Sequence, residues 1–387
     1  MKAVILAAGE GTRLEPLTEL RPKPMLPIAN KPLLEHVLES VVEAGVEEVV
    51  FVVGYKRERI QDHFGDGDAW GVDITYAVQD PPRGTGDALL QAEPYIGEDF
   101  IALNGDRIIE ADAIQTVMDR RRETGDVCLA VTRVADPTLY GVVELDGEDV
   151  TAIREKPPAH LVTSDLINAG VYGFGPDVFA AIRETETHGE LALTDTLTNL
   201  MASRRVCAVR FDGPWLDVTY PWDLVAVNAS VLDRDRAGFG AGVRIDEDAT
   251  LVDPVAVAEN VHVAPGARVL GGSAVGGNVT IGPNAVVSNS VLFPDVTVGA
   301  GAVVKDCVVG ENATVGPQAT IEGGRTAVVL GDTVYRDVKF GGIVGDSADL
   351  AGAVTVTPGT VVGNRTVVGS GALVSGRIAT DAEVRRG

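Results

Sequence analysis

Residues 257–287 read VAENVHVAPGARVLGGSAVGGNVTIGPNAVV, with an aliphatic residue at every sixth position. The same spacing begins at Ile245, resumes at Val309 after a slip of the frame, and ends at Val374. A six-residue period is typical of a parallel β-helix, in which three hexads make one triangular coil and the aliphatic side chains fill the prism. We therefore predict a left-handed parallel β-helix over residues 237–387.

One part of this half does not follow the hexad period. Residues 322–342 break it and are expected to leave the β-helix as a loop, while the polar, glycine-rich residues 233–242 are expected to be a linker. A chain of 387 residues, 45% of them hydrophobic, has room for two cores. We accordingly expect two domains, residues 1–236 and 237–387.

The first half has a different texture, in which short β-branched runs alternate with amphipathic stretches. The alternation predicts a Rossmann-like α/β domain, with a mixed, mostly parallel sheet and helices on both faces. We expect it to fold by itself, because its core is separate from the hexad prism. The expected strands are residues 3–6, 49–53, 74–78, 100–103 and 127–131, and the clearest helices are residues 32–44 and 111–124.

The charge balance is strongly acidic. The chain has 32 Lys and Arg against 56 Asp and Glu, a net charge of −24, which excludes the basic surface that nucleic-acid binding requires. Only seven of the basic residues are Lys and 25 are Arg. Because acidic residues help solubility more than Lys does, this composition favours adaptation to a salty cytoplasm over an ordinary acidic protein.

The cysteines and the first residues bear on location. Cys128, Cys207 and Cys307 are far apart and form no CxxC pair, so neither a zinc site nor a disulfide framework is indicated. The apolar residues 1–8 are followed closely by Glu10, which makes them too short for a signal peptide or a membrane span. We expect a cytoplasmic protein without a membrane or nucleic-acid partner.

A glycine-rich loop follows the first expected strand, in the sequence LAAGEGTRL at residues 6–14. Such a loop is where α/β sheets bind phosphates, because bare backbone amides can approach the oxygens. It is not a P-loop, since no Gly-Lys-Ser/Thr follows, and Leu14 stands where the dinucleotide fingerprint needs glycine. In the nearby RPKPMLP at residues 21–27, prolines on both sides stiffen the backbone of Lys23. The alternative is a solvated lysine in a proline-rich turn.

These two segments together resemble the signature of the sugar-phosphate nucleotidyltransferase family, which joins an NTP to a sugar 1-phosphate and releases pyrophosphate. The resemblance covers roughly residues 1–236, and a β-helix is a common companion in this family. Six further motifs carry it: residues 79–88 (QDPPRGTGDA), 104–106 (NGD), 140–142 (YGV), 155–157 (EKP), 168–172 (NAGVY) and 215–218 (WLDV).

The resemblance implies a role for each group of residues. A sugar 1-phosphate is already an anion, so the reaction needs fixed cations rather than a general base. By resemblance, Arg13 and Lys23 are catalytic, and Asp106 and Asp217 hold Mg²⁺. The implied nucleotide-binding residues are Leu6, Ala7, Ala8, Gly9, Gly11, Thr12, Gln79, Gly84 and Thr85. The implied sugar-phosphate-binding residues are Gly141, Glu155, Lys156 and Asn168.

Several of these residues also have a structural interpretation. Asp106 follows Asn-Gly and is compatible with a plain turn, although an acid at the end of an apolar strand lies where α/β sheets bind ligands. Glu155 and Lys156 are compatible with an exposed ion pair, and Asn168 with a turn cap. Gln79 is compatible with a surface amide, but its donor and acceptor also match the edge of a pyrimidine.

Two short segments indicate the substrates through a more specific resemblance. Residues 84–88 (GTGDA) and 220–224 (YPWDL) resemble archaeal-type uridylyltransferases for N-acetylglucosamine 1-phosphate more than thymidylyltransferases. We therefore favour UTP over dTTP and N-acetylglucosamine 1-phosphate as the sugar. Two alternatives remain open, a glucose-1-phosphate thymidylyltransferase and a non-catalytic regulatory subunit.

The β-helix raises a further alternative, a bifunctional enzyme with glucosamine-1-phosphate N-acetyltransferase activity. Such acetyl transfer usually needs a histidine base. His262 is the only histidine of the hexad region, and residues 322–342 contain none. We expect acetyl transfer to be absent or weak, and we expect the β-helix to make a homo-oligomer, with a trimer favoured.

Overall fold

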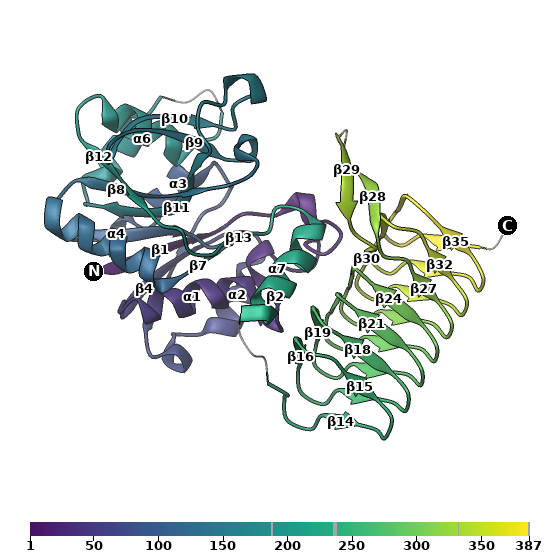
Figure 1. Cartoon of the computed structure of the whole chain (residues 1–387). Helices are drawn as coiled ribbons and strands as arrows, with labels where there is room; N and C mark the ends of the chain where they lie inside the picture. The colour runs from purple at the N-terminus through teal and green to yellow at the C-terminus, as the bar shows by residue number, and fades with distance from the viewer. Residues whose placement is uncertain (187–188, 235–237, 332, 386–387) are drawn as a thin grey trace. The chain divides into compact units, whose positions relative to one another are not determined.

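The structure is a computed structural model that describes residues 1–186, 189–234, 238–331 and 333–385. The contacts between residues divide the chain into two compact units. Figure 1 shows the whole chain coloured by residue number. The first unit comprises Met1–Glu10, Pro22–Met25 and Leu33–Asp217, and the second comprises Gly11–Arg21, Leu26–Pro32 and Val218–Gly387. The expected boundary after residue 236, inside the expected linker 233–242, lies outside the described residues and stays a prediction.

A nine-stranded sheet forms the centre of the first unit. Every strand runs in the same direction as β1 except β10 and β11, each of which is antiparallel to its neighbours. This confirms the predicted mixed, mostly parallel sheet. The order is β5 (Asp73–Val78), β4 (Glu48–Val53), β1 (Lys2–Ala7), β6 (Phe100–Asn104), β11 (Leu166–Phe174), β8 (Val127–Arg133), β12 (Val206–Arg210), β10 (Asp149–Glu155) and β9 (Gly141–Asp146).

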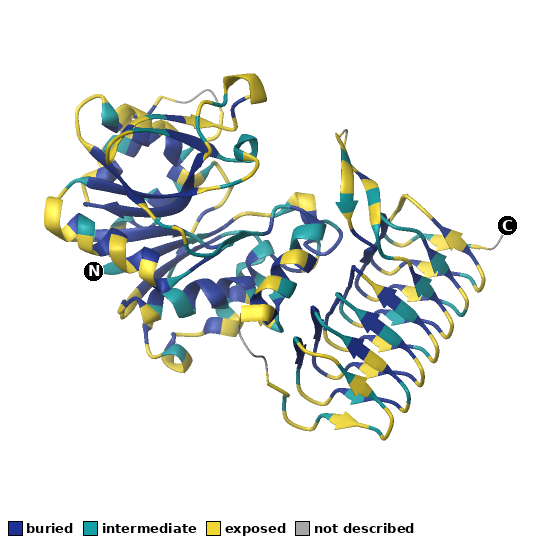
Figure 2. Ribbon diagram, viewed as in Figure 1, coloured by how far each residue is buried: buried dark blue, intermediate teal, exposed yellow. Residues whose placement is uncertain are grey.

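Helices cover both faces of this sheet, as its alternating side chains require. Along β1, Ala3 and Ile5 belong to one core and Val4 to the other, because successive side chains of a strand point to opposite faces. Burial extends over most of the length of β1, β4, β6, β8, β11 and β12 (Figure 2). The first core includes α1 (Leu33–Glu43), α2 (Arg57–Phe64) and α4 (Ala111–Thr124), and the second includes α3 (Thr85–Leu90), α5 (Val178–Glu184) and α6 (Leu193–Met201).

Three parallel sheets of two- and three-residue strands make up most of the second unit. The first is β14 (Arg244–Ile245), β17 (His262–Val263), β20 (Thr280–Ile281), β23 (Thr297–Val298), β26 (Thr314–Val315), β31 (Asp349–Leu350), β34 (Val367–Val368) and β37 (Glu383–Val384). The second is β15 (Thr250–Leu251), β18 (Arg268–Leu270), β21 (Val286–Ser288), β24 (Val303–Lys305), β27 (Thr320–Ile321), β32 (Thr355–Val356) and β35 (Leu373–Val374). The third is β16 (Val255–Val257), β19 (Ser273–Val275), β22 (Val291–Leu292), β25 (Cys307–Val309), β30 (Gly342–Val344), β33 (Thr360–Val362) and β36 (Arg377–Ile378).

This arrangement is consistent with the predicted left-handed β-helix, and the hexad aliphatics fill its core. From Val257 to Val374 the predicted aliphatic positions are at most 2% exposed. Ile245 differs, at 41% exposed, because β14 is the edge strand of its sheet and is paired with a coil on one side only. The six-residue period therefore predicted the interior correctly and overestimated burial at the first coil.

The third sheet is buried on its outer side as well. The middle residues of its strands, such as Ala274, Val308 and Ile343, point away from the prism and are fully buried. Helix α7 (Pro221–Arg234) packs against β19, β22 and β25 of this sheet. The buried Asn228 of α7 donates to the Gly272 carbonyl at 2.9 Å. The β-helix thus carries a second apolar layer on one of its three faces.

The segment that breaks the hexad period is ordered as a β-hairpin. Strands β28 (Arg325–Leu330) and β29 (Thr333–Lys339) pair antiparallel within residues 322–342, which were expected to leave the β-helix as a loop. The second unit also contains the helical turn η1 (Thr12–Leu14) and the short pair β2 (Pro27–Ile28) and β3 (Lys31–Pro32).

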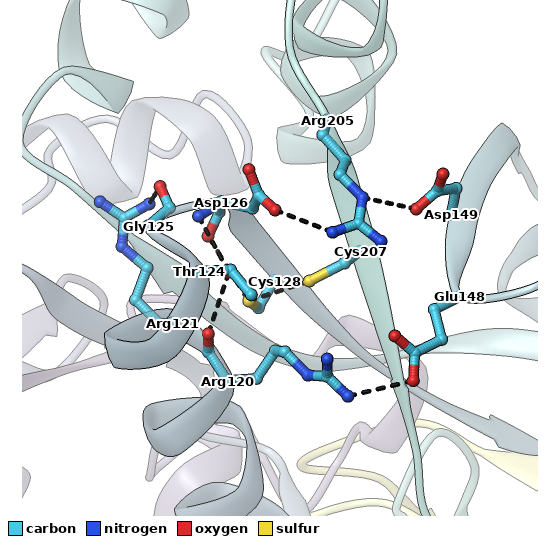
Figure 3. A network of polar contacts seen from close by, with 10 residues as sticks. All are labelled: Arg120, Arg121, Thr124, Gly125, Asp126, Cys128, Glu148, Asp149, Arg205 and Cys207. Atoms are coloured by element: carbon cyan, nitrogen blue, oxygen red, sulfur yellow. Dashed lines mark hydrogen bonds and ion pairs between the residues drawn. The ribbon is translucent and has the colours of Figure 1, made fainter.

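Two of the three cysteines meet in the first unit. Cys128 of β8 lies opposite Cys207 of β12, and their Sγ atoms are 3.1 Å apart (Figure 3). Arg205 bridges Asp126 and Asp149 beside them. Contact with Cys207 and burial raise the pKa of the Cys128 thiol, so it stays protonated. Cys128, Cys207 and Cys307 are all free thiols, and all are buried.

None of the helices in the described part of the chain is both long and apolar enough to cross a bilayer.

Candidate active site

The predicted lysine and the first predicted carboxylate come together in the first unit. Lys23 begins the helical turn η2 (Lys23–Met25), and its Nζ is 2.6 Å from Oδ2 of Asp106. Asp106 follows β6, which pairs parallel with β1, so that Leu6 lies beside Asn104. The Gly105 N–H donates to the Leu6 carbonyl at 2.9 Å. The carboxyl ends of the two central strands therefore hold this pair, where open α/β sheets bind ligands.

The second predicted carboxylate is brought in by a separate pair of strands. Strand β13 (Trp215–Asp217) pairs antiparallel with β7 (Arg107–Ile109), and the pairing sets Asp217 opposite Arg107, next to Asp106. The Tyr140 hydroxyl donates to Oδ2 of Asp217 at 3.2 Å. Nε of Arg107 is 3.7 Å from Asp217 Oδ1 and 4.0 Å from Asp106 Oδ1. The two predicted metal carboxylates thus flank one guanidinium.

Arg107 is the main residue of the site that the sequence analysis did not include. Its guanidinium carbon lies 5.3 Å from the ring centre of Trp215 and 5.7 Å from that of Tyr140. A side chain at Gly170 would meet Asn104 Nδ2 at 2.6 Å and Arg107 Nη1 at 2.9 Å, so these two side chains would have to shift. The available signal was its position, a cation directly after the 104–106 motif.

The charges at this point compensate one another. Burial by itself raises the pKa of Asp106, but the nearby charges of Lys23 and Arg107 outweigh burial and leave that pKa below its ordinary value. Burial by itself lowers the pKa of Arg107, but the negative charges of Asp106 and Asp217 outweigh burial and leave that pKa above its ordinary value. Lys23 and Arg107 therefore favour the ionised form of Asp106, and Arg107 also lies beside Asp217.

The predicted sugar-phosphate residues also lie close to one another. Gly141 of β9 is opposite Glu155 of β10, and a side chain at Gly141 would meet Glu155 Oε2 at 3.2 Å and Asn168 at 3.5 Å. The Lys156 N–H donates to the Tyr140 carbonyl, and its Nζ is 3.3 Å from Glu155 Oε1. Both side chains of this ion pair are more than a third exposed, so it contributes little to stability and can exchange partners with a ligand.

Asn168 shapes the backbone next to the charged centre. Its Oδ1 accepts the Gly170 N–H at 2.9 Å, and its Nδ2 donates to the Tyr172 hydroxyl at 2.8 Å. The register of β11 against β8 shifts between Asn168 and Tyr172, and Gly170 has a φ of 83°. Burial raises the pKa of Tyr172 to about 12, so its hydroxyl stays neutral. Such bulges are frequent beside active sites, where they re-aim side chains.

The predicted base-reading residues form a fixed turn. Gln79 is 5% exposed, and its amide nitrogen donates to the Gly84 carbonyl and to Asp87. The Thr85 hydroxyl accepts the Leu193 N–H at 3.0 Å. Gly84 has a φ of 104°, a conformation that favours glycine. Gln79 thus organises this turn, and its amide oxygen is the atom available to accept from a base.

The first glycine-rich loop is divided between the units. Leu6, Ala7, Ala8 and Gly9 belong to the first unit, where Ala7 and Ala8 are buried and Gly9 is exposed. Gly11, Thr12 and Arg13 belong to the second, where the Arg13 guanidinium carbon lies 5.9 Å from the ring centre of Tyr220. The nucleotide-binding and catalytic roles of these residues stay predictions.

A complete metal site made by the protein is not present in the described part of the chain. No three His, Cys, Asp or Glu residues there are close enough to hold an ion. The donor set of Asp106 and Asp217 instead fits a hard cation that takes its other ligands from water and substrate phosphates, as Mg²⁺ usually does.

Comparison with known families agrees with this geometry. The profile described as "Nucleotidyl transferase" matches residues 2–234, which contain all the residues of the charged centre. The chain belongs to this family. A divalent metal is general in it, as are nucleoside triphosphate and sugar 1-phosphate substrates. A second profile, the "GMPPB C-terminal domain", matches residues 251–380 in the β-helix.

Individual relatives cover different parts of the chain. The bifunctional protein GlmU of Methanococcus vannielii is 32% identical over 99% of this chain and 97% of its own length. The UTP–glucose-1-phosphate uridylyltransferase AglF of Haloferax volcanii is 40% identical over 58% of this chain and 93% of its own length. Against three GlmU proteins of Methanococcus maripaludis, the chain spans only 55–62% of their length.

A solved structure matches part of the chain. A Bacillus anthracis protein assigned as a glucose-1-phosphate thymidylyltransferase, in complex with a sucrose, is 28% identical, with a TM-score of 0.57. The match covers 62% of this chain and 97% of that protein.

Proposed function

We propose that this protein transfers a nucleotidyl group from UTP to a hexose 1-phosphate and releases pyrophosphate. N-acetylglucosamine 1-phosphate is the favoured acceptor, and dTTP with glucose 1-phosphate is the alternative. One observation carries the proposal: the Lys23–Asp106 contact at 2.6 Å, with Asp217 and Arg107 directly beside it. A non-catalytic regulatory subunit would have no need for these paired charges.

The chemistry requires what these residues offer. An oxygen of the sugar phosphate attacks the α-phosphorus of the nucleotide, the bond to the β-phosphate breaks, and pyrophosphate leaves. The difficulty is to bring two anions together and to stabilise the charge of the leaving group. Lys23, and Arg13 by resemblance, neutralise the triphosphate, and Lys156 neutralises the incoming sugar phosphate.

The metal in this proposal is Mg²⁺. Bound with the nucleotide, it would withdraw charge from the phosphates. Asp106 and Asp217 would hold it, and the Tyr140 hydroxyl orients Asp217. Arg107 lies beside both carboxylates, and Lys23 and Arg107 together hold the pKa of Asp106 below its ordinary value.

The nucleotide preference rests on Gln79 and on the relatives. The Gln79 amide oxygen can accept the N–H of uracil or thymine, and the turn at Gly84 and Thr85 fixes the direction of the Gln79 side chain. The name of AglF specifies UTP, and the Bacillus anthracis relative is assigned to thymidylyl transfer. A pyrimidine is common to both.

The test is a pyrophosphate-release screen in molar KCl with Mg²⁺. UTP, dTTP, ATP and GTP are each paired with glucose 1-phosphate, glucosamine 1-phosphate and N-acetylglucosamine 1-phosphate. We expect UTP to be at least as good as dTTP, and both to exceed the purine nucleotides. A strict purine preference, or no turnover with any pair, would contradict the proposal.

A second candidate function, acetyl transfer, is favoured by the full-length likeness to a bifunctional GlmU. His262 Nε2 lies 2.7 Å from Asp246 Oδ2, a pairing found around catalytic bases. Nη2 of Arg244 is also 2.7 Å from the same nitrogen, so in either tautomer that nitrogen already has a partner, donating to Asp246 or accepting from Arg244. We propose that acetyl transfer is absent or weak. Thiol release from acetyl-CoA with glucosamine 1-phosphate at about 1 s⁻¹ or faster would overturn this proposal.

We also propose a cytoplasmic homo-oligomer assembled through the β-helix, with a trimer favoured. The support is the three-sided prism, which has two sheets that α7 does not cover in addition to the covered one. Sedimentation equilibrium of the full chain in molar KCl gives the mass directly. A monomer across the micromolar range would contradict the proposal.

A further inference from the structure

Resting on the proposed nucleotidyl transfer, we propose that the β-helix positions the loop that carries Arg13 and leads into Lys23. Two anchors do this, an ion pair between Arg21 and Asp346, and an aromatic contact between Tyr335 and Tyr220. Arg21, Asp346 and Tyr335 would then be positioning residues for the reaction, although two of them lie more than 300 residues from the loop.

The loop itself packs with the β-helix. Gly11–Arg21 belongs to the same compact unit as the coils. Asn364, fully buried between two coils, donates to the Pro16 carbonyl at 3.1 Å and to Glu19 Oε2 at 2.8 Å. Thr380, in the next coil, donates to the same carboxylate. Buried polar groups of a regular β-helix are thus used to hold a segment from the start of the chain.

Arg21 is the first anchor. It is 6% exposed, its Nη2 lies 2.8 Å from Glu311 Oε2 and 3.0 Å from Asp346 Oδ2, and its guanidinium covers the ring of Phe293. Asp346 is 2% exposed and also accepts the Glu311 N–H at 2.7 Å. Removing Arg21 takes the cation away from the buried Asp346, and removing Asp346 leaves Arg21 with the partly exposed Glu311.

Arg21 lies close to Lys23 in the sequence, so its ion pair can affect the position of Lys23. One residue, Pro22, separates it from Lys23, and proline fixes φ, so a shift of Arg21 is transmitted along a stiff backbone. Nη1 of Arg21 also donates to the Leu17 carbonyl at 3.3 Å, which ties the middle of the loop to the same ion pair.

Tyr335 is the second anchor. It stands on β29 of the hairpin, its ring centre is 4.8 Å from that of Tyr220, and its hydroxyl donates to the Tyr220 hydroxyl at 3.1 Å. Arg13 also approaches Tyr220, with its guanidinium carbon 5.9 Å from the centre of the Tyr220 ring. Trp222 stacks on Tyr220 at 4.8 Å and completes the cluster. The hairpin that interrupts the hexad period thereby supports the side chain under Arg13.

The expected kinetic signature follows from these contacts. Fixed cations stabilise a leaving group only if they are held in place before the reaction. A displacement of about 1 Å can cost ~100-fold in rate. Loss of either anchor should therefore lower kcat and raise KM for the nucleotide. KM for the sugar phosphate should change little, because the residues proposed to bind it lie on β9, β10 and β11 of the first unit or directly after β10.

The experiment compares Asp346→Asn and Tyr335→Ala in the full chain with matched controls. Arg365→Ala removes the exposed Arg365–Asp381 ion pair on the coils above Asp346. Arg325→Ala removes the exposed Arg325–Asp337 ion pair within the same hairpin as Tyr335. We expect kcat/KM for UTP to fall at least ~10-fold in the two anchor variants and less than twofold in the controls.

A second readout does not need activity. Arg13 is exposed but the next residue, Leu14, is buried, so we expect trypsin to cut the bond between them only when the loop leaves its place, while Pro22 protects the bond after Arg21. The digestion is run under native conditions, and mass spectrometry measures the rate of cleavage after Arg13. We expect this rate to be ~10-fold higher in both anchor variants than in the wild type and the controls. If Asp346→Asn does not fold, Tyr335→Ala and its control carry the test alone.

The outcomes separate this inference from the proposed function. A wild type without pyrophosphate release contradicts the proposed function, and the proteolysis then still tests whether the anchors hold the loop. An active wild type whose folded anchor variants match it in kcat, KM and cleavage rate overturns the inference alone. Equal rises in KM for both substrates point to general loosening and overturn it as well.

Discussion

Replacing Lys23 by alanine should damage the reaction far more than the fold. Its ammonium contacts Asp106 at 2.6 Å, but the Asp106 side chain is 34% exposed, so solvent screens the pair and it contributes at most ~1 kcal/mol to stability. Removing one group that stabilises transition-state charge costs ~100- to 1,000-fold in kcat, or about 2.7–4 kcal/mol. The reaction barrier should therefore rise several times more than the free energy of unfolding falls.

The assay measures pyrophosphate release at saturating nucleotide and sugar phosphate, together with thermal unfolding, for Lys23→Ala and Lys2→Ala. Lys2 is a matched control. It pairs with Glu48 at 2.7 Å and lies at the start of β1, whereas the site lies at the other end of that strand. Both variants should lose similar, small amounts of stability, and only Lys23→Ala should lose activity. If Lys23→Ala keeps more than about a tenth of wild-type kcat, or if Lys2→Ala is equally inactive, the reasoning is refuted.

The remaining predictions concern the metal, salt and the thiols. Arg107→Gln should tighten Mn²⁺ binding to the free protein by roughly tenfold in titration calorimetry, because a fixed cation near both carboxylates repels a divalent ion; unchanged or weaker binding would contradict this. The melting temperature should rise from dilute buffer to molar KCl as salt screens the net charge of −24, and a flat or falling curve would count against adaptation to salt. A thiol reagent should label Cys128, Cys207 and Cys307 only on unfolding, because all three are buried; fast labelling of the native protein would show that they are accessible.

Much of the architecture was predictable because it is encoded by local periods. The hexad repeat specifies a β-helix wherever aliphatic residues return to the same edge of the prism, and it located inward positions from Val257 to Val374. Alternating strands and helices likewise gave the layered sheet. The hexad pattern showed that residues 322–342 interrupt the repeat. It did not predict the hairpin there, because a break in the repeat carries no information about the structure of the residues that cause it.

The site was predictable in its parts more than in its assembly. The motif residues Lys23 and Asp106 were named from the sequence, and their contact follows from β1 and β6 being neighbours. Arg107 was missed because its position directly after the 104–106 motif does not by itself distinguish a surface arginine from one between two carboxylates. Its role depends on β13 pairing with β7, a contact between segments about a hundred residues apart.

The sequence by itself determined the family, the two fold types and the residues that carry charge, because each of these depends on short motifs or regular spacing. Only the tertiary structure decided which buried polar groups pair. Arg21 meets Asp346 across 325 positions, and Cys128 meets Cys207 across 79. The physical reason is that a buried charge must find a compensating partner, and that partner is set by how the chain folds back on itself. No local pattern specifies it.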